Sequence, residues 1–283
     1  MDSTTSSRSL ASRVAIVTGG GSGIGEAVSR ELARRGARVV VADISADRAS
    51  RVAGAIAGSG GLATASTVDV TKEADISALV RETAVTYGRL DYQFNNAGIA
   101  ISGDARDLTS DQWRRVLEVD LYGVLYGTLA AYRIMAEQGF GHIVNTASGA
   151  GLVPTPLAGP YSTAKFAVVG LSQSLRLEGA DLGVKVSVVC PGYVRTPIFD
   201  AMLVVGLPRE AVLRPPGRIK MVSPEALAQA ILRGVERNQP VIAFPRYMSL
   251  AWRVACLFPR SLDRTVLPAV RELRADRSVP DRT

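Results

Sequence analysis

The sequence RVAIVTGGGSGIG at residues 13–25 decides the fold. Its first six residues are mostly β-branched and apolar, which predicts a short buried strand, and the apolar spacing of residues 24–35 predicts a helix that ends at Gly36. Glycines between a buried strand and a helix let the backbone turn tightly, and the helix N-terminus then offers free N–H groups to a phosphate. We predict a nucleotide-binding turn here, with a merely flexible loop as the alternative.

Strands and helices alternate along the rest of residues 13–245, and no change in composition divides this region. The pattern predicts further strands at residues 38–42, 64–70, 90–94, 143–146, 184–189 and 241–244. It predicts further helices at residues 45–57, 74–87, 111–137, 161–179 and 224–237. Because most of these strands are apolar on both faces, we expect a single α/β domain whose parallel sheet is covered by helices on each side.

Three segments fall outside this alternation. Residues 1–12 are polar and predict a mobile leader, and residues 246–283 form an amphipathic, Arg-rich C-terminal extension. Residues 192–223 are punctuated by prolines but have an apolar middle. A long loop of that kind is typical of a lid over a site.

Composition excludes several classes of protein. A hydrophobic content of 47% excludes general disorder, and much of the net charge of +7 lies in the C-terminal extension, which argues against a nucleic-acid-binding face. No signal peptide or membrane-spanning run is visible in the sequence. One histidine, His142, and two cysteines, Cys190 and Cys256, favour neither a metal centre nor a disulfide framework, so we expect a reducing, cytoplasmic location.

Asp43 lies 20 residues after Gly23, at the end of the second predicted strand. A carboxylate there accepts hydrogen bonds from the adenosine ribose and repels a 2′-phosphate, and neither Ser22 nor Ile44 offers that phosphate a positive charge. The arrangement predicts NAD rather than NADP as cofactor. The alternative is that Asp43 only caps the helix that starts after Ser45.

Ser148, Tyr161 and Lys165 form the candidate catalytic set. Tyr161 and Lys165 are four residues apart on a predicted helix and share a face, while Ser148 follows the fifth strand at the edge where parallel sheets bind ligands. An ammonium group beside a phenol favours tyrosinate, which can take the proton of an alcohol, and a serine hydroxyl can hold the substrate oxygen. A Tyr-x-x-x-Lys pair alone is more often a surface pair; the preceding glycine turn and Ser148 favour the catalytic interpretation.

These motifs together resemble a classical short-chain dehydrogenase/reductase over about residues 12–245. The resemblance rests on Thr18, Gly19, Gly23, Gly25, Asp69, Asn95, Asn96, Ala97, Gly98, Ser148, Tyr161, Lys165, Pro191, Gly192 and Thr196. It implies a doubly wound Rossmann-like sheet of about seven parallel strands, with Tyr161 as acid/base, Lys165 as its electrostatic partner and ribose ligand, and Ser148 as donor to the substrate oxygen. It also implies a homotetramer or homodimer built through residues 111–137 and 161–179.

The same resemblance assigns the cofactor site. The residues expected to bind NAD are Gly19, Ser22, Gly23, Ile24, Gly25, Asp43, Asp69, Val70, Asn96, Ala97, Gly98, Tyr161, Lys165, Pro191, Gly192, Val194 and Thr196. Asp69 and Val70 are expected to border the adenine, and Val194 and Thr196 to meet the nicotinamide carboxamide.

One position departs from the family pattern. Classical members usually carry Asn in the middle of the long helix at residues 111–137, where its backbone carbonyl holds a water in a proton relay, but here Asp120 stands at that position. A carboxylate near Lys165 would favour the ammonium form and oppose tyrosinate. We expect activity to persist with its basic limb shifted upward in pH.

Other conspicuous residues are given structural interpretations. His142 is expected to be a structural or surface histidine, and Cys190 a small buried apolar side chain. Asp104, Asp107 and Asp111 are expected to belong to a solvated loop and a helix N-terminus rather than to a metal site.

The sequence allows several roles for the C-terminal extension. Leu250, Val254 and Leu257 follow helical spacing among arginines, so the segment could pack on its own domain, lie on an anionic membrane surface, close over an apolar substrate or contact a neighbouring subunit. Beyond Pro268 we expect a frayed end.

The sequence thus predicts an NAD-dependent oxidoreductase that interconverts an apolar secondary alcohol and its ketone. Leu152, Val153, Leu157 and the lid at residues 197–207 are expected to wall the pocket. Two alternatives come from other classes: a catalytically silent NAD-binding sensor or scaffold, and a peripheral membrane protein that acts through its C-terminal helix.

Overall fold

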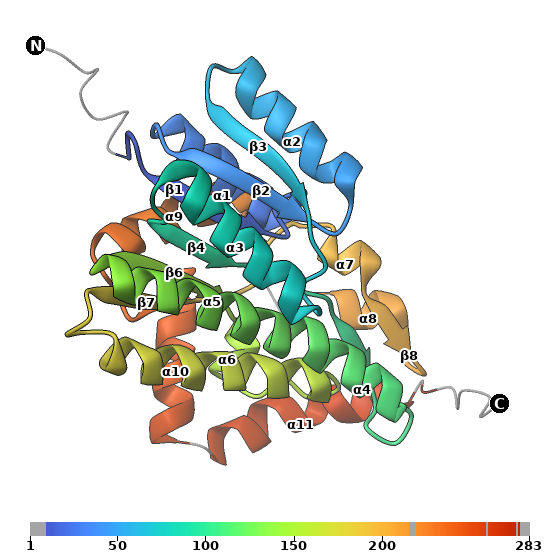
Figure 1. Ribbon diagram of the computed structural model, residues 1–283. Helices are drawn as coiled ribbons and strands as arrows, with labels where there is room; N and C mark the ends of the chain where they lie inside the picture. Colours follow the sequence, from blue (N-terminus) through green and yellow to red (C-terminus); the bar gives the residue numbers. More distant parts are fainter. Residues whose placement is uncertain (1–9, 215–218, 259, 276, 278–283) are drawn as a thin grey trace, which may run out of the picture.

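A seven-stranded, all-parallel sheet forms the centre of the molecule (Figure 1). The computed structural model describes residues 10–214, 219–258, 260–275 and 277. Its strands, in spatial order, are β3 (Leu62–Thr67), β2 (Arg38–Asp43), β1 (Val14–Thr18), β4 (Tyr92–Asn95), β6 (Gly141–Thr146), β7 (Val184–Pro191) and β9 (Val241–Phe244). The order reverses at β1, and ligands of such sheets bind outside the strand ends at the reversal point. The Rossmann-like fold class predicted from the sequence is confirmed.

Helices cover both faces of this sheet. They are α1 (Gly23–Arg34), α2 (Ala46–Gly58), α3 (Glu73–Tyr87), α4 (Ser110–Leu117), α5 (Gly123–Gln138), α6 (Gly159–Glu178) and α9 (Pro224–Glu236). Figure 1 shows α3, α5 and α6 in front of the sheet, with α1 and α9 behind it. A hydrophobic core lies on each face of the sheet, and alternate residues of β1 belong to different cores. Ala15 and Val17 pack with α1, α2 and α9, while Val14 and Ile16 pack with α3 and α5.

The predicted helix at residues 111–137 is interrupted by a π-helical turn, Glu118–Tyr122, between α4 and α5. Such turns insert one residue into the helical repeat and occur at functional sites. Here the turn carries Asp120, which is fully buried. The extra residue therefore directs this side chain inward, toward the sheet.

The segment predicted as an irregular lid is partly ordered. It contains α7 (Ile198–Ala201), β8 (Leu203–Val205) and α8 (Arg209–Leu213), and β8 pairs in parallel with β5 (Ile101–Gly103) in a small second sheet. The lid is thus tied to the loop that follows β4 (Figure 1).

The two ends of the chain differ from expectation. Leu10 is buried in the core that contains α1, so the predicted leader is anchored by its tenth residue, while residues 1–9 lie outside the described part. At the other end, α10 (Arg246–Leu257) is followed by α11 (Arg260–Ala275), which continues through Pro268. The prediction of a frayed end beyond Pro268 is wrong as far as Ala275, because ion pairs described below hold this end. No helix in the described ranges has the length and apolar character needed to cross a bilayer.

Candidate active site

The glycine turn between β1 and α1 is a rigid cradle. A Cβ on Gly25 would lie 2.2 Å from the carbonyl oxygen of Gly19, so only glycine lets α1 start this close to the turn. Asn96 donates to the Thr18 carbonyl at 3.1 Å, and the Thr18 hydroxyl accepts from the backbone N–H of Asn96 at 3.0 Å. These bonds argue against the alternative of a flexible loop, and the N–H groups at the start of α1 fit a phosphate.

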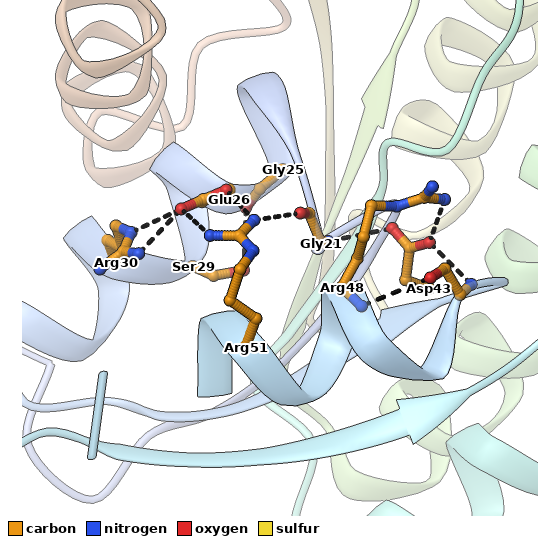
Figure 2. Close-up of polar contacts among 9 residues, drawn as sticks. Gly21, Gly25, Glu26, Ser29, Arg30, Asp43, Arg48 and Arg51 are labelled. Carbon is orange, nitrogen blue, oxygen red and sulfur yellow. Dashed lines mark hydrogen bonds and ion pairs between the residues drawn. The ribbon is translucent and has the colours of Figure 1, made fainter. Parts of the chain in front are cut away.

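Asp43 lies beside this cradle, as Figure 2 shows. Its carboxylate is 4% exposed and accepts from the N–H of Gly21 at 3.0 Å and from Arg48 Nη2 at 2.7 Å. The cap of α2 is Ser45, whose side chain accepts from Arg48 N. Helix capping alone therefore does not explain Asp43. Arg48, in the first turn of α2, was not among the predicted site residues.

Lys165 forms a buried ion pair with Asp120. The distance from Lys165 Nζ to Asp120 Oδ2 is 3.2 Å, Asp120 Oδ1 also accepts from the N–H of Ile99 at 2.7 Å, and Lys165 donates to the Thr146 carbonyl at 3.1 Å. Lys165 Nζ lies 5.5 Å from the centre of the Tyr161 ring. The departure from the family pattern at position 120 therefore gives the lysine a direct anionic partner.

Burial and charge act against each other in this group. Burial raises the pKa of Tyr161, Lys165 lowers it, and the Asp120 carboxylate raises it again, so that its pKa lies above the ordinary value. Burial lowers the pKa of Lys165, but the negative partners Asp120 and Tyr161 outweigh burial and raise it. Lys165 is thus held as an ammonium, and in this structure its effect on the Tyr161 pKa is offset.

Ser148 completes the set at the end of β6. Its hydroxyl accepts from the N–H of Ala150 at 3.2 Å, which fixes the side chain at the start of a short 3-10 turn, Gly149–Gly151. A hydrogen bond with Ser148 also lowers the pKa of Tyr161. The structure therefore brings Ser148, Tyr161 and Lys165 together.

One cavity of about 1330 Å³ joins the cradle to this catalytic set. The predicted site residues that line it are Gly19, Ser22, Gly23, Ile24, Asp43, Asp69, Val70, Asn96, Ala97, Gly98, Asp120, Ser148, Tyr161, Lys165, Pro191, Gly192, Val194 and Thr196. Gly25 does not line the cavity; it lies behind the turn, where it allows the close approach of α1 to Gly19. Of the predicted substrate walls, Val153 and Leu157 line the cavity, whereas Leu152 packs in the core with Val168 and Val188.

The remaining conspicuous residues have structural explanations. His142 is buried and hydrogen-bonded to Ser187 at 2.8 Å, and burial lowers its pKa to about 3, so it is a structural rather than a surface histidine. Cys190 is buried as predicted, which raises the pKa of its thiol to about 12. The prediction of a solvated loop is wrong for Asp104, which is 1% exposed and paired with arginines. No metal-ligand cluster occurs among the residues described.

The C-terminal extension packs through a different face of α10 than the sequence suggested. Met248 is buried and Trp252 packs against the core around Val168 and Val188, whereas Leu250 and Leu257 are 64% and 73% exposed. The face with leucine spacing is therefore not the one that packs on the domain. The predicted contacts with a membrane surface or with another subunit stay predictions.

Comparisons with known proteins agree with this geometry. A family profile described as short chain dehydrogenase matches residues 13–203. The cyclohexanol dehydrogenase of Acinetobacter sp. (strain SE19) is 37% identical over 220 residues, covering 77% of this chain and 86% of that protein. The cis-4-hydroxycyclohexanecarboxylate dehydrogenase of Sinomonas cyclohexanicum is 41% identical over 228 residues, covering 78% of this chain and 88% of that protein.

Among solved structures, a short chain dehydrogenase/reductase from Burkholderia phymatum in complex with NAD superposes with a TM-score of 0.78 at 25% identity. The match covers 97% of this chain and 98% of that one. The sheet order, the cradle, the Ser148–Tyr161–Lys165 set and these matches lead to one conclusion: the chain belongs to the short-chain dehydrogenase/reductase family of oxidoreductases.

Proposed function

We propose that this protein is an NAD-dependent dehydrogenase that interconverts an apolar secondary alcohol and its ketone. The observation that carries the proposal is the single cavity that runs from the glycine cradle and Asp43 to Ser148, Tyr161 and Lys165. A cofactor and a substrate can share that cavity, and the groups that an alcohol oxidation needs stand at one end of it.

The residues present fit NAD. The N-terminus of α1 would hold the pyrophosphate, the buried carboxylate of Asp43 would accept from the adenosine ribose, and Asp69 with Val70 would border the adenine. Asn96, Ala97 and Gly98 line the middle of the cavity, and Val194 and Thr196 line it near Pro191. When bound, NAD supplies the acceptor for the hydride that leaves the alcohol carbon. The NAD-bound Burkholderia neighbour supports this assignment.

Tyr161 is the proposed acid/base. Its phenol, as tyrosinate, takes the proton of the alcohol, and the ammonium group of Lys165 stabilises that anion electrostatically. Ser148 donates to the substrate oxygen and holds it near the phenol. In the direction of ketone reduction the same phenol returns the proton.

Asp120 is the proposed positioning residue of this set. It contacts Lys165 and not the reacting atoms, and its carboxylate keeps the lysine charged and fixed between α6 and the π turn. The same charge opposes tyrosinate, so the reaction in the direction of oxidation should need a more alkaline medium than it would with Asn at this position.

The proposed substrate carries an aliphatic ring. Aliphatic and aromatic side chains line the substrate end of the cavity, among them Val153, Leu157, Phe199 and Met202. Two relatives are named for cyclohexanol and for a hydroxycyclohexanecarboxylate, which are ring alcohols. Both facts support an alicyclic secondary alcohol.

The test is to incubate the protein with NAD and a series of cycloalkanols and to follow formation of the reduced cofactor. We expect turnover in the parent and none in Tyr161→Phe, which should still bind NAD because it lacks only the phenolic oxygen. Turnover by Tyr161→Phe at the parental rate would refute the assigned role. NAD binding without turnover of any alcohol or ketone by the parent would instead favour the silent sensor.

A further inference from the structure

The helix α11 supplies part of the cavity wall. Five of its residues line the cavity: Val266, Ala269, Val270, Glu272 and Leu273. The three larger apolar ones, Val266, Val270 and Leu273, are spaced by four and three residues, which places them on one face of the helix. Val270 is 7% exposed, and Met248 and Ala251 of α10 continue the same wall. This stretch lies beyond residues 13–203, which the family profile matches.

Two ion pairs tie Arg274 of α11 and Arg277, just beyond it, to the segment that follows β5. Arg274 Nε donates to Asp104 Oδ2 at 2.7 Å, and Arg277 binds both oxygens of Asp107, with Nε–Oδ2 at 2.6 Å. The side chains of Asp104 and Asp107 are each 1% exposed, so the two carboxylates are almost fully covered. We call these two pairs, Arg274–Asp104 and Arg277–Asp107, the C-terminal latch.

Both carboxylates, Asp104 and Asp107, form hydrogen-bonded ion pairs with arginines. Hydrogen bonds from Arg106 and Arg274 hold the pKa of Asp104 well below its usual range despite the opposing effect of burial. Arg277 lowers the pKa of Asp107 in the same way. Each buried carboxylate of the latch is therefore paired with an arginine that favours its ionised form.

The latch connects the end of α11 to β5, and through β5 to the lid. Asp104 follows β5 directly, β5 pairs with β8 of the lid, and the Ser102 hydroxyl lies 3.6 Å from the sulfur of Met202. Ser102 and Met202 line the cavity too. Figure 1 shows α11 below α6, running in the direction of α4.

We propose that Val266, Val270 and Leu273 of α11 form the specificity wall of the substrate site, and that the C-terminal latch positions this wall. The inference rests on the proposed function and adds the substrate class: largely apolar secondary alcohols bulkier than a single six-membered ring. The cavity exceeds the roughly 300–1,000 Å³ of an ordinary ligand pocket, which leaves room for a large substrate beside a cofactor. We expect a small ring alcohol near Tyr161 to depend less on α11 than a bulky one does.

The test compares two alcohols, cyclohexanol and a decahydronaphthalenol, in the double variant Arg274→Ala/Arg277→Ala. We expect kcat/KM for the bulky alcohol to fall about tenfold or more, mainly through KM, because apolar contacts of a few methylene groups are lost. The value for cyclohexanol and the affinity for NAD should change little. Arg271→Ala is the matched control, since Arg271 is an exposed arginine of the same helix and lies outside the latch.

Two further variants separate a specificity wall from a merely structural helix. Arg274→Lys/Arg277→Lys retains both charges and should restore part of the preference for the bulky alcohol. Leu273→Trp should fill space at the wall and lower kcat/KM for the bulky alcohol more than for cyclohexanol. Equal losses for both alcohols in the alanine double variant, or an unchanged ratio of their kcat/KM values, would overturn the inference.

Calorimetric binding of the bulky alcohol to the NAD-loaded protein gives a readout that does not depend on turnover. If the parent proves inactive, the proposed function fails, yet weaker binding by the latch variant would still support the wall. Binding that is equal in parent, latch variant and Leu273→Trp would refute the wall, whatever the activity.

Discussion

The tightest contact in the cofactor cradle allows a quantitative prediction for Gly25→Ala. A methyl group at position 25 would meet the Gly19 carbonyl oxygen at 2.2 Å and the amide nitrogen of Asn96 at 2.6 Å. A normal carbon–oxygen contact needs a separation about 1 Å larger, and the atom that must yield belongs to the backbone of the cradle itself. The start of α1 must therefore move away from the turn by roughly that amount.

A misplacement of about 1 Å can lower the rate of an enzymatic reaction about 100-fold. We take the loss of NAD affinity to be of the same size. We expect the dissociation constant for NAD to rise by about that factor, which corresponds to about 2.7 kcal/mol of binding free energy. The assay is calorimetric titration with NAD, combined with thermal unfolding to show that the variant is folded at the temperature used.

Gly54→Ala is the matched control because Gly54 is also a helical glycine, lies in α2 and has no neighbouring atom within 4 Å of a built Cβ. Its NAD affinity should equal that of the parent, and its stability should rise by about 0.4–1 kcal/mol because alanine restricts the unfolded chain. If Gly25→Ala bound NAD as tightly as the parent does, the close approach of α1 to the turn would not be what shapes the cofactor site.

Two further predictions concern buried ionisable groups. Asp120→Asn removes the carboxylate that raises the Tyr161 pKa, so the alkaline rise of alcohol oxidation should move to lower pH; superimposable pH–rate profiles of parent and variant would contradict this. Burial lowers the pKa of His142 to about 3, whereas the unfolded chain has the ordinary histidine pKa of about 6.5. Between these two pH values only the unfolded chain binds a proton at His142. The contribution of His142 to the free energy of unfolding is therefore fully present above about pH 6.5 and is lost as the pH falls toward 3. Urea unfolding at several pH values should therefore show a flatter acid slope for His142→Asn than for the parent, and parallel slopes would refute this account.

Local patterns were sufficient to predict the sheet and the cofactor cradle. The alternation of buried strands and amphipathic helices predicted each of the seven parallel strands, because strands buried on both faces are recognisable without knowledge of their neighbours. Boundaries were less accurate at β3, which spans Leu62–Thr67 instead of residues 64–70, because this edge strand is mostly exposed and lacks an apolar pattern. The cradle residues were predictable because their function depends on backbone geometry that glycine alone permits.

The proximity of the proposed catalytic residues was predictable, but their electrostatics were not. The spacing of Tyr161 and Lys165 places them on one helical face, whereas the contact between Lys165 and Asp120 depends on a π turn that shifts the register of a helix 45 residues earlier. Burial of the whole group, and with it the balance of effects on the Tyr161 pKa, depends on how α4, α5 and α6 pack. No local pattern contains that information.

The acids of the loop after β5 show why the substrate side could not be predicted. Asp104 and Asp107 have the local sequence of a solvated turn, and the arginines near the end of the chain have the composition of a frayed tail. Each interpretation is reasonable by itself, but the two segments are 170 residues apart and neutralise each other in space. A buried carboxylate requires partners, and Asp104, which is 1% exposed, has one nearby in Arg106 and a second in Arg274 of α11. Such dependence between distant segments is a property of the folded chain, and neither segment shows it alone.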